Sequence, residues 1–242
     1  MSRGQKNRSR RAQLAGELAR VGLGRLSVVE FLIVLVLLMV AAPFLGMFPH
    51  GRLVEAVLMT LLMGSAVLAV GQSRRVLVWA VILVQPVLLG KWLNHFSPDL
   101  IPPVVFLVSA LLFMVFVVAQ FLRFIFRARR VNLEVLCAGI ATYLLMGLLW
   151  GFAYTLVELV IPHAFAFNGT PALLEGFNAF YFSYITLATV GYGDYTPVAP
   201  VARMLAGMEA MAGTMFVAVL ISRLVALYSS QGPEMPEEEK TK

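Results

Sequence analysis

A run of five residues, Thr189 to Gly193, has a composition suited to binding a cation through its backbone. The run reads Thr-Val-Gly-Tyr-Gly. Glycine adopts positive φ values that most residues avoid, so Gly191 and Gly193 allow successive carbonyl groups to turn toward one common side. The hydroxyl of Thr189 adds a further oxygen ligand to the carbonyl groups. The spacing therefore predicts cation coordination by Thr189, Val190, Gly191 and Tyr192, while the ring of Tyr192 points away and braces the loop.

A short helix has to position this run. The preceding residues are apolar from about Leu173 to Ala188, which is shorter than the ~20 residues that cross a membrane as a helix. Thr170 and Pro171 fit a helix start, with a hydroxyl N-cap and a proline in the first helical position, and Glu175 falls in the first turn. Irregular backbone at membrane depth is tolerated only where protein buries it or water lines it. We therefore expect a re-entrant helix that enters the membrane from outside and is followed directly by the Thr-Val-Gly-Tyr-Gly run.

The composition indicates a membrane protein with several spans. Of the 242 residues, 60% are hydrophobic and 13% are charged, whereas soluble domains are about a quarter charged. The net charge of +6 comes from residues between apolar runs, so membrane topology explains it and nucleic-acid binding is not expected. The single cysteine, Cys137, excludes a disulfide within the chain. His50, His95 and His163 fall in predicted loops without metal-binding spacing, so we expect neither an enzyme nor a cofactor.

Six apolar stretches approach or exceed the length that crosses a membrane as a helix. They cover residues 27–48, 53–71, 76–93, 100–122, 132–161 and 200–228. The predicted fold is an all-α membrane protein of six transmembrane helices, with the re-entrant helix between the fifth and the sixth. We divide it into a four-helix domain over 27–122, a basic linker over 123–131 and a second domain over 132–228.

The two ends of the chain form separate segments in this division. Residues 1–26 are basic, with apolar residues at helical spacing between the charges. They predict either a short amphipathic helix on the membrane surface or a disordered basic tail. Residues 229–242 are expected to form a short cytoplasmic tail without room for a regulatory domain.

Lysine and arginine residues predict the orientation of the chain. Most of them lie on the side of the two termini, and the predicted opposite side holds only Arg52, Lys91 and Arg203. The positive-inside rule therefore places both termini in the cytoplasm. Tyr154 falls near the outer end of its span, where aromatic residues are enriched at the membrane interface.

Residues from about 131 to 228 resemble the two-span pore module of the potassium channel superfamily. The Thr-Val-Gly-Tyr-Gly run matches the selectivity filter of these channels letter for letter. The resemblance extends to Tyr181-Phe182-Ser183 before the run, to Asp194 and Pro197 after it, and to Arg203 and Gly213 in the last helix. It implies an outer helix, a pore helix, a filter whose backbone carbonyls replace the hydration shell of K+, and an inner helix.

The resemblance also implies an assembly and residue roles. One chain supplies a quarter of each carbonyl ring, so the working unit would be a homotetramer around a four-fold axis along the membrane normal. Tyr181 and Phe182 hold the positions that pack near the filter tyrosine, and Asp194 supports the filter from its outer end. Gly213 aligns with the gating hinge of the inner helix, although close helix packing would also explain a glycine there.

The first four predicted spans depart from the voltage-gated channels that share this layout. A voltage sensor carries arginine at every third position through the membrane, and the stretch 101–122 has no charged residue. Arg123 and Arg127 follow at its cytoplasmic end, as the positive-inside rule predicts. The resemblance therefore covers the pore and not the sensor, and we expect weak voltage dependence.

Glu209 is an ionisable residue inside the last predicted span, about 13 Å from its start at ~1.5 Å per residue. In some related channels a carboxyl on the pore helix braces the filter, but the aligned position here is Ile185. We hypothesise that Glu209 supplies this brace from the inner helix, through Ser183, Tyr184 or Thr186. The carboxyl would be protonated, since burial disfavours the charged form. The alternative is a charged carboxyl that faces the aqueous cavity and attracts cations.

These features predict a potassium-selective channel in the plasma membrane, with K+ and membrane lipid as its partners. A potassium transporter and a non-conducting, channel-like accessory subunit are the two alternatives. Transporters with degenerate filter glycines carry four non-identical repeats in one long chain, whereas this chain has one filter and no evident repeat. Single-channel recording separates the three classes, because only a channel passes ions in open bursts.

Overall fold

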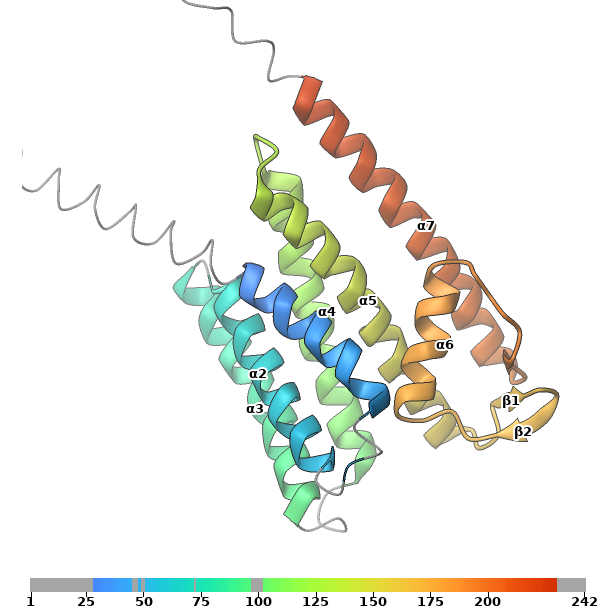
Figure 1. Ribbon diagram of the computed structural model, residues 1–242. Coiled ribbons are helices and arrows are strands. Elements are labelled where there is room, and N and C mark those ends of the chain that lie inside the picture. The colour runs from blue at the N-terminus through green and yellow to red at the C-terminus, as the bar shows by residue number, and fades with distance from the viewer. Residues whose placement is uncertain (1–27, 45–47, 49–50, 72, 97–101, 230–242) are drawn as a thin grey trace, which may run out of the picture.

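The structure is a computed structural model that describes residues 28–44, 48, 51–71, 73–96 and 102–229 (Figure 1). The predicted basic N-terminal segment and residues 230–242 of the predicted tail lie outside these residues. The two interpretations of the N-terminal segment, as a surface helix or as a basic tail, therefore stay predictions.

The described chain is mostly helical. Its helices are Val28–Phe44, α2 (Gly51–Val70), α3 (Arg74–Phe96), α4 (Pro103–Arg127), α5 (Leu133–Val160), α6 (Phe177–Leu187) and α7 (Pro200–Ser229). Five of them, α2, α3, α4, α5 and α7, are long and apolar enough to cross a membrane by length and composition. The chain is thus a multi-pass membrane protein. The described part of the first helix is shorter, so the sixth span stays a prediction.

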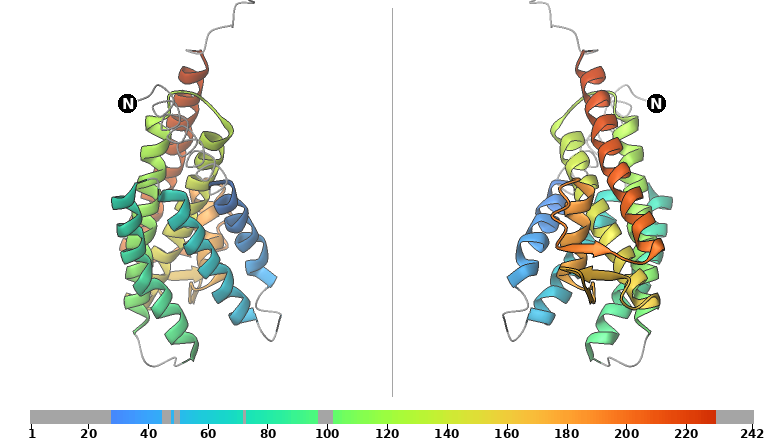
Figure 2. Two further views of the ribbon diagram at one scale, coloured as in Figure 1. Left: turned by 90° about the vertical axis from the view of Figure 1, so that its left-hand side faces the viewer. Right: turned by 90° about the vertical axis from the view of Figure 1, so that its right-hand side faces the viewer.

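The helix α5 lies between two groups of helices. Figure 1 shows the Val28–Phe44 helix, α2, α3 and α4 on one side of α5, and α6 and α7 on the other. Helix α5 packs against α4 as well as against α6 and α7. The two views of Figure 2 show the last turns of α7 projecting beyond the other helices.

The first group of helices packs through an apolar core. Phe31 and Phe121 are buried, and their ring centroids lie 5.3 Å apart. On α4 the buried positions recur every three or four residues, at Leu107, Ala110, Phe113, Met114, Val117, Phe121 and Ile125. Apolar side chains such as Leu112 and Val115 are exposed on the other face. One face of α4 thus packs in the bundle, and the other suits contact with lipid.

A small sheet follows α5, and the all-α prediction overlooked it. The strand β1 (Phe165–Phe167) pairs antiparallel with β2 (Thr170–Ala172) and with β3 (Tyr195–Pro197). Asn168 and Gly169 make the turn between β1 and β2, with φ of 48° and 80°. Asn-Gly is a strong signal for such a two-residue hairpin turn, because both positions require positive φ.

The predicted start of the pore helix at Thr170-Pro171 is wrong, because these residues pair with β1. The helix α6 begins at Phe177, after Gly176 with φ of 57°, so Glu175 precedes the helix instead of lying in its first turn. Its 11 residues are too few to cross a membrane. In the first group, α4 continues through Arg127, past its predicted end at residue 122.

Candidate functional site

The loop between α6 and β3 contains the Thr-Val-Gly-Tyr-Gly run. Left-handed backbone recurs at every second residue, since Thr189, Gly191 and Gly193 have φ of 57°, 53° and 79°. The positive φ values confirm the expectation for the two glycines. Thr189 is β-branched, and such residues take positive φ only where the surrounding structure holds them there. Strained backbone of this kind is typical of functional sites.

The N–H groups at the start of this loop all donate to carbonyl groups of α6. Val190 N–H and Gly191 N–H donate to the Ile185 carbonyl at 2.8 and 3.2 Å, and Thr189 N–H donates to Thr186 O at 2.9 Å. Within the described residues, the carbonyl groups of residues 189–192 accept no hydrogen bond. The carbonyl oxygens are therefore available to a ligand. Because the N–H groups of residues 189–191 are already bonded, the loop suits a cation better than an anion.

Two polar contacts hold the outer end of the loop. The Tyr181 hydroxyl donates to Asp194 Oδ2 at 2.8 Å, and Asn168 N–H donates to the Asp194 carbonyl at 2.8 Å. Desolvation acts to raise the pKa of Asp194, but hydrogen bonds from Tyr195 N–H and the Tyr181 hydroxyl outweigh it and hold that pKa below its usual range. Asp194 is thus a carboxylate at neutral pH, fixed between α6 and the β1–β2 turn.

The carboxyl of Glu209 lies between three helices. It is fully buried within the chain, with 0% exposure. The Tyr154 hydroxyl of α5 donates to Glu209 Oε2, and Ser183 Oγ of α6 lies 2.5 Å from Glu209 Oε1. Ser183 Oγ also lies 2.7 Å from the Gly147 carbonyl of α5. Glu209 therefore contacts α6 and α5, and it reaches the 189–193 loop only indirectly, through α6.

A proton count favours the neutral acid in this network. The Gly147 carbonyl can only accept, so the single proton of the Ser183 hydroxyl is used in that contact. The Tyr154 proton is used on Glu209 Oε2. The remaining contact, between Ser183 Oγ and Glu209 Oε1, then needs a proton on the carboxyl. A protonated Glu209 satisfies all three contacts, whereas a carboxylate leaves two oxygens facing each other at hydrogen-bond distance.

Glycines allow the helices around α6 to approach closely. A Cβ at Gly147 would lie 2.1 Å from the Tyr184 ring, and a Cβ at Gly151 would lie 2.4 Å from the Phe180 ring. A Cβ at Gly213 would lie 2.2 Å from the Leu187 carbonyl. Close packing therefore explains Gly213 directly, and its role as a gating hinge stays a prediction. Gly147 and Gly151 were missed, although their spacing is the small-xxx-small pattern of membrane helix contacts.

An aromatic cluster surrounds the Glu209 network. The Phe182 ring centroid lies 5.0 Å from that of Tyr154 and 5.4 Å from that of Phe165. Tyr154 is fully buried, so its interpretation as a membrane-interface aromatic is wrong. Among the described residues, no ring contact joins Phe182 to Tyr192. The Phe182 side chain of α6 thus packs between α5 and the sheet.

Several apolar side chains of this region are exposed on the described part of the chain. Val190 is 52% exposed and Tyr192 is 72% exposed. On α7, Met204, Met208, Met211 and Met215 are all exposed, and they recur every three or four residues, so they share one face of the helix. The 189–193 loop and this face of α7 therefore offer apolar surface to lipid or to further chains.

Comparison with known proteins gives matches over this same region. A family model described as "Ion channel" matches residues 134–230. The chain is 34% identical over 87 residues to the inward rectifier potassium channel Kirbac3.1 of Paramagnetospirillum magnetotacticum, covering 36% of this chain and 27% of that protein. It is 36% identical over 104 residues to protein LctB of Bacillus caldotenax, covering 40% of this chain and 74% of LctB. The match with Kirbac3.1 thus spans about a quarter of that protein's length. No solved structure matches the chain significantly.

Proposed function

We propose that this chain, which belongs to the potassium channel superfamily, assembles as a homotetramer and conducts K+ selectively and passively across the plasma membrane. One observation carries the proposal. The N–H groups at the start of the 189–193 loop bond to the end of α6, while the carbonyl groups of residues 189–192 have no partner in the described chain.

This arrangement suits a filter that is organised before the ion arrives. A K+ filter replaces the hydration shell of the ion with carbonyl oxygens from four loops. Thr189, Val190, Gly191 and Tyr192 would supply these oxygens, and Gly193 would turn the chain outward. Because the Ile185 and Thr186 carbonyls already hold the N–H groups, the loop needs little rearrangement to bind K+. Conduction of this kind involves no chemical reaction and no cofactor besides the permeant ion.

The need for four chains follows from geometry. A single loop surrounds an ion on one side only, and a closed carbonyl ring needs a four-fold axis. The exposed Val190 and Tyr192 side chains and the exposed methionine face of α7 support contacts between chains. Most lysine and arginine residues lie on the predicted side of the two termini, and this uneven distribution supports cytoplasmic termini.

Four residues, Tyr181, Asp194, Glu209 and Phe182, would support the filter. Tyr181 would fix Asp194 at the outer end, through the 2.8 Å hydrogen bond between them. Protonated Glu209 would hold α6 against α5 and α7, and Phe182 would fill the space between Tyr154 and Phe165. These roles assign Glu209 to positioning the pore helix and not to attracting cations from the cavity.

Planar-bilayer recording of the purified protein tests the proposal. We expect unitary K+ currents, a reversal potential near that of K+ in mixed K+ and Na+, and the native mass of a tetramer in mild detergent. Tyr192→Asp should shift the reversal potential toward that of a non-selective pore, and Tyr192→Phe should shift it little. Flux without unitary currents would identify a transporter, and tetramers that pass no ions would identify an accessory subunit; either result overturns the proposal.

A further inference from the structure

A cavity of about 490 Å³ lies where the first helix and α2 meet α5 and α6. Most of its wall is apolar, and Leu38, Met39, Met59 and Leu148 are among the side chains that line it. Pockets of this volume hold ligands of the size of a drug molecule. The cavity is therefore large enough for a small organic compound with an apolar body.

One carboxyl group gives this cavity its charge. Among the described residues that line it, Glu55 of α2 is acidic and none is a lysine, arginine or histidine. Lys91 Nζ of α3 donates to Glu55 Oε1 at 2.8 Å, but Lys91 does not line the cavity. Within the described part of the chain, Glu55 Oε2 accepts no hydrogen bond. This second oxygen is therefore available to a donor inside the cavity.

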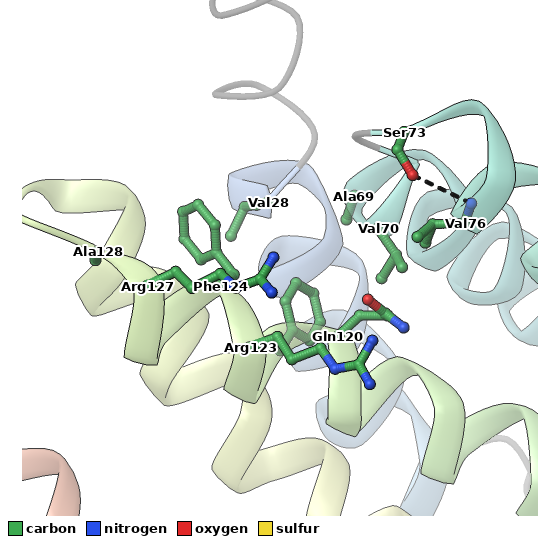
Figure 3. A pocket seen from close by; sticks show the side chains of 11 residues that line it. Val28, Ala69, Val70, Ser73, Val76, Gln120, Arg123, Phe124, Arg127 and Ala128 are labelled. Carbon is green, nitrogen blue, oxygen red and sulfur yellow. Dashed lines mark hydrogen bonds between the residues drawn. The ribbon is translucent and has the colours of Figure 1, made fainter.

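A second cavity of the molecule has the opposite charge. It measures about 410 Å³ and lies near the end of α2, whereas Glu55 lies near the start of that helix. Figure 3 shows Arg123 and Arg127 of α4 beside this second cavity. Among the described residues, no acidic side chain lines it. A ligand with an ammonium group is therefore favoured in the cavity with Glu55 and disfavoured in the other one.

The aromatic rings of α6 strengthen this preference for a cation. Phe177, Phe180, Tyr181 and Tyr184 all line the cavity with Glu55. The rings of Phe177 and Tyr181 are stacked, with their centroids 6.5 Å apart. An ammonium group is attracted to the face of an aromatic ring. Both tyrosine hydroxyl groups already donate, one to a carboxylate and one to a backbone carbonyl, so neither offers its proton to an anion.

Two residues of this cavity also hold the 189–193 loop. Tyr181 lines the cavity, and its hydroxyl donates to Asp194 Oδ2 beyond the end of the loop. Ile185 lines the cavity as well, and its carbonyl accepts from the N–H groups of Val190 and Gly191. A compound bound in the cavity therefore lies against the residues to which both ends of the loop are attached.

We propose that this cavity binds a lipophilic ammonium compound and that the bound compound changes the open probability of the pore. The charged nitrogen contacts Glu55 and the rings of α6, and the apolar body lies among the side chains of the first helix and α5. Lys91 competes with the ligand for the same carboxyl. The binding half stands on the cavity alone, whereas the effect on open probability rests on the proposed function.

Binding of three ten-carbon probes to the protein in phosphatidylcholine nanodiscs tests the site, with empty nanodiscs as the blank. We expect decylamine to bind saturably and about tenfold more tightly than decanol, since a hydrogen bond to a charged group contributes about this factor. Decanoate should bind more weakly than decanol. Equal binding of the three probes would identify an apolar groove that accepts any alkyl chain and would overturn the proposal.

The matched variants are Glu55→Gln and Glu30→Gln, because Glu30 has the same charge and does not line the cavity. In Glu55→Gln, decylamine should bind no more tightly than decanol. Decanol should bind as it does to the wild type, which shows that the cavity persists. Glu30→Gln should keep the tenfold preference for the amine. Equal loss of this preference in both variants would indicate general attraction to acidic residues and would contradict the site.

Lys91→Gln provides a test of opposite sign that does not depend on the stability of Glu55→Gln. This variant frees Glu55 Oε1 from its partner, so decylamine should bind several-fold more tightly while decanol binding stays the same. Ala42→Phe places a ring at the wall of the cavity and should weaken the binding of both probes. Unchanged or weaker binding of decylamine to Lys91→Gln would overturn the role of Glu55.

Planar-bilayer recording tests the effect on open probability. We expect decylamine to change the open probability of the wild type but not that of Glu55→Gln, with the unitary K+ current unchanged in both. If decylamine lowers the unitary current equally in both proteins, it blocks the pore itself and the second half of the proposal is wrong. Absence of current under all conditions contradicts the proposed function, while binding to nanodiscs still decides the site.

Discussion

The two halves of the molecule differ in what they bury. Among the described residues, the buried polar or charged side chains are Thr142, Glu158, Ser183 and Glu209, all in α5, α6 and α7. The described helices before α5 bury apolar side chains only. Apolar packing between membrane helices tolerates sliding, because lipid is as apolar as the core. A polar network has one satisfying arrangement, so the second half can fix the pore helix and its loop in a single position.

The two halves also use glycine differently. Glycines of α5 and α7 permit approaches between helices that any Cβ would block, and glycines of the loop permit positive φ. In α2 and α3, Gly64 and Gly90 have open space or ordinary contacts around them. Substitution of these glycines by alanine therefore tests the contrast between the halves.

The largest effect, on K+ conduction, is expected from a substitution of Gly191. Alanine there has open space around its Cβ but must adopt φ of 53°, which is strained for any residue with a side chain. We expect Gly191→Ala to abolish K+ conduction while the tetramer still forms. Gly64→Ala also places its Cβ in open space, but in helical backbone, and should conduct normally. Single-channel recording and native mass of both variants check this, and normal currents from Gly191→Ala would contradict the assignment of the filter.

The second effect is expected at Gly147. A Cβ there would overlap the Tyr184 ring at 2.1 Å, and such overpacking costs about 3 kcal/mol when the neighbour cannot move. The matched variant is Gly90→Ala, between α3 and α4, whose Cβ would lie 3.4 Å from Phe106. We expect a lower thermal midpoint of tetramer dissociation for Gly147→Ala only. Equal midpoints would show that the second half is as adaptable as the first.

The parts of the fold that sequence alone predicted are those with local signals. The filter can be predicted from sequence because its chemistry lies in five consecutive residues, and it stays a prediction. The long apolar helices were predicted because apolar length is a local property. The hairpin was not predicted, although Asn168-Gly169 signals it, because Thr170-Pro171 also fits a helix start. The two local signals conflict, and in the structure β1 pairs with β2 and also with β3, which lies farther along the chain.

The Glu209 network shows a different kind of limit. Sequence identified the carboxyl as buried, but its partners come from helices separated by many residues. Tyr154 is 55 residues away and Ser183 is 26 residues away. No periodicity within one helix predicts which residue of another helix it meets. The position of Tyr154 at the end of a span suggested the membrane interface, and only three-dimensional packing places it beside Glu209.

The third effect is expected at Glu209. Glutamine resembles the protonated acid, since its amide N–H can donate to Ser183 and its carbonyl can accept from Tyr154. Glu209→Gln should therefore keep the dissociation midpoint and the unitary conductance. Glu209→Leu leaves Tyr154 without its partner and should destabilise the tetramer by about 1–2 kcal/mol, with faster flicker of the filter.

An infrared difference spectrum decides the protonation state directly. The wild type should show the C=O stretch of a buried carboxylic acid, and Glu209→Gln should lack it. A carboxylate band, together with lower unitary conductance in Glu209→Gln, would support a charge that faces the cavity. That result would contradict the three-helix contact as the role of Glu209.

The smallest expected effect is that of membrane voltage on open probability, and it depends on α4 of the first half. A charge that crosses the whole field contributes about 2.3 kcal/mol per 100 mV, and steep gating needs several such charges in each chain. The part of α4 before Arg123 carries no charged residue. Arg123 and Arg127 lie in its last turns, at one end of the span, so no charge lies along the apolar stretch that would cross the field. We expect open probability to change less than tenfold over 100 mV, and Arg123→Gln to leave that slope unchanged.

A conductance–voltage curve as steep as that of a voltage-gated channel, flattened by Arg123→Gln, would contradict this prediction. It would mean that α4 moves as a voltage sensor and that the first half of the molecule also switches between two positions.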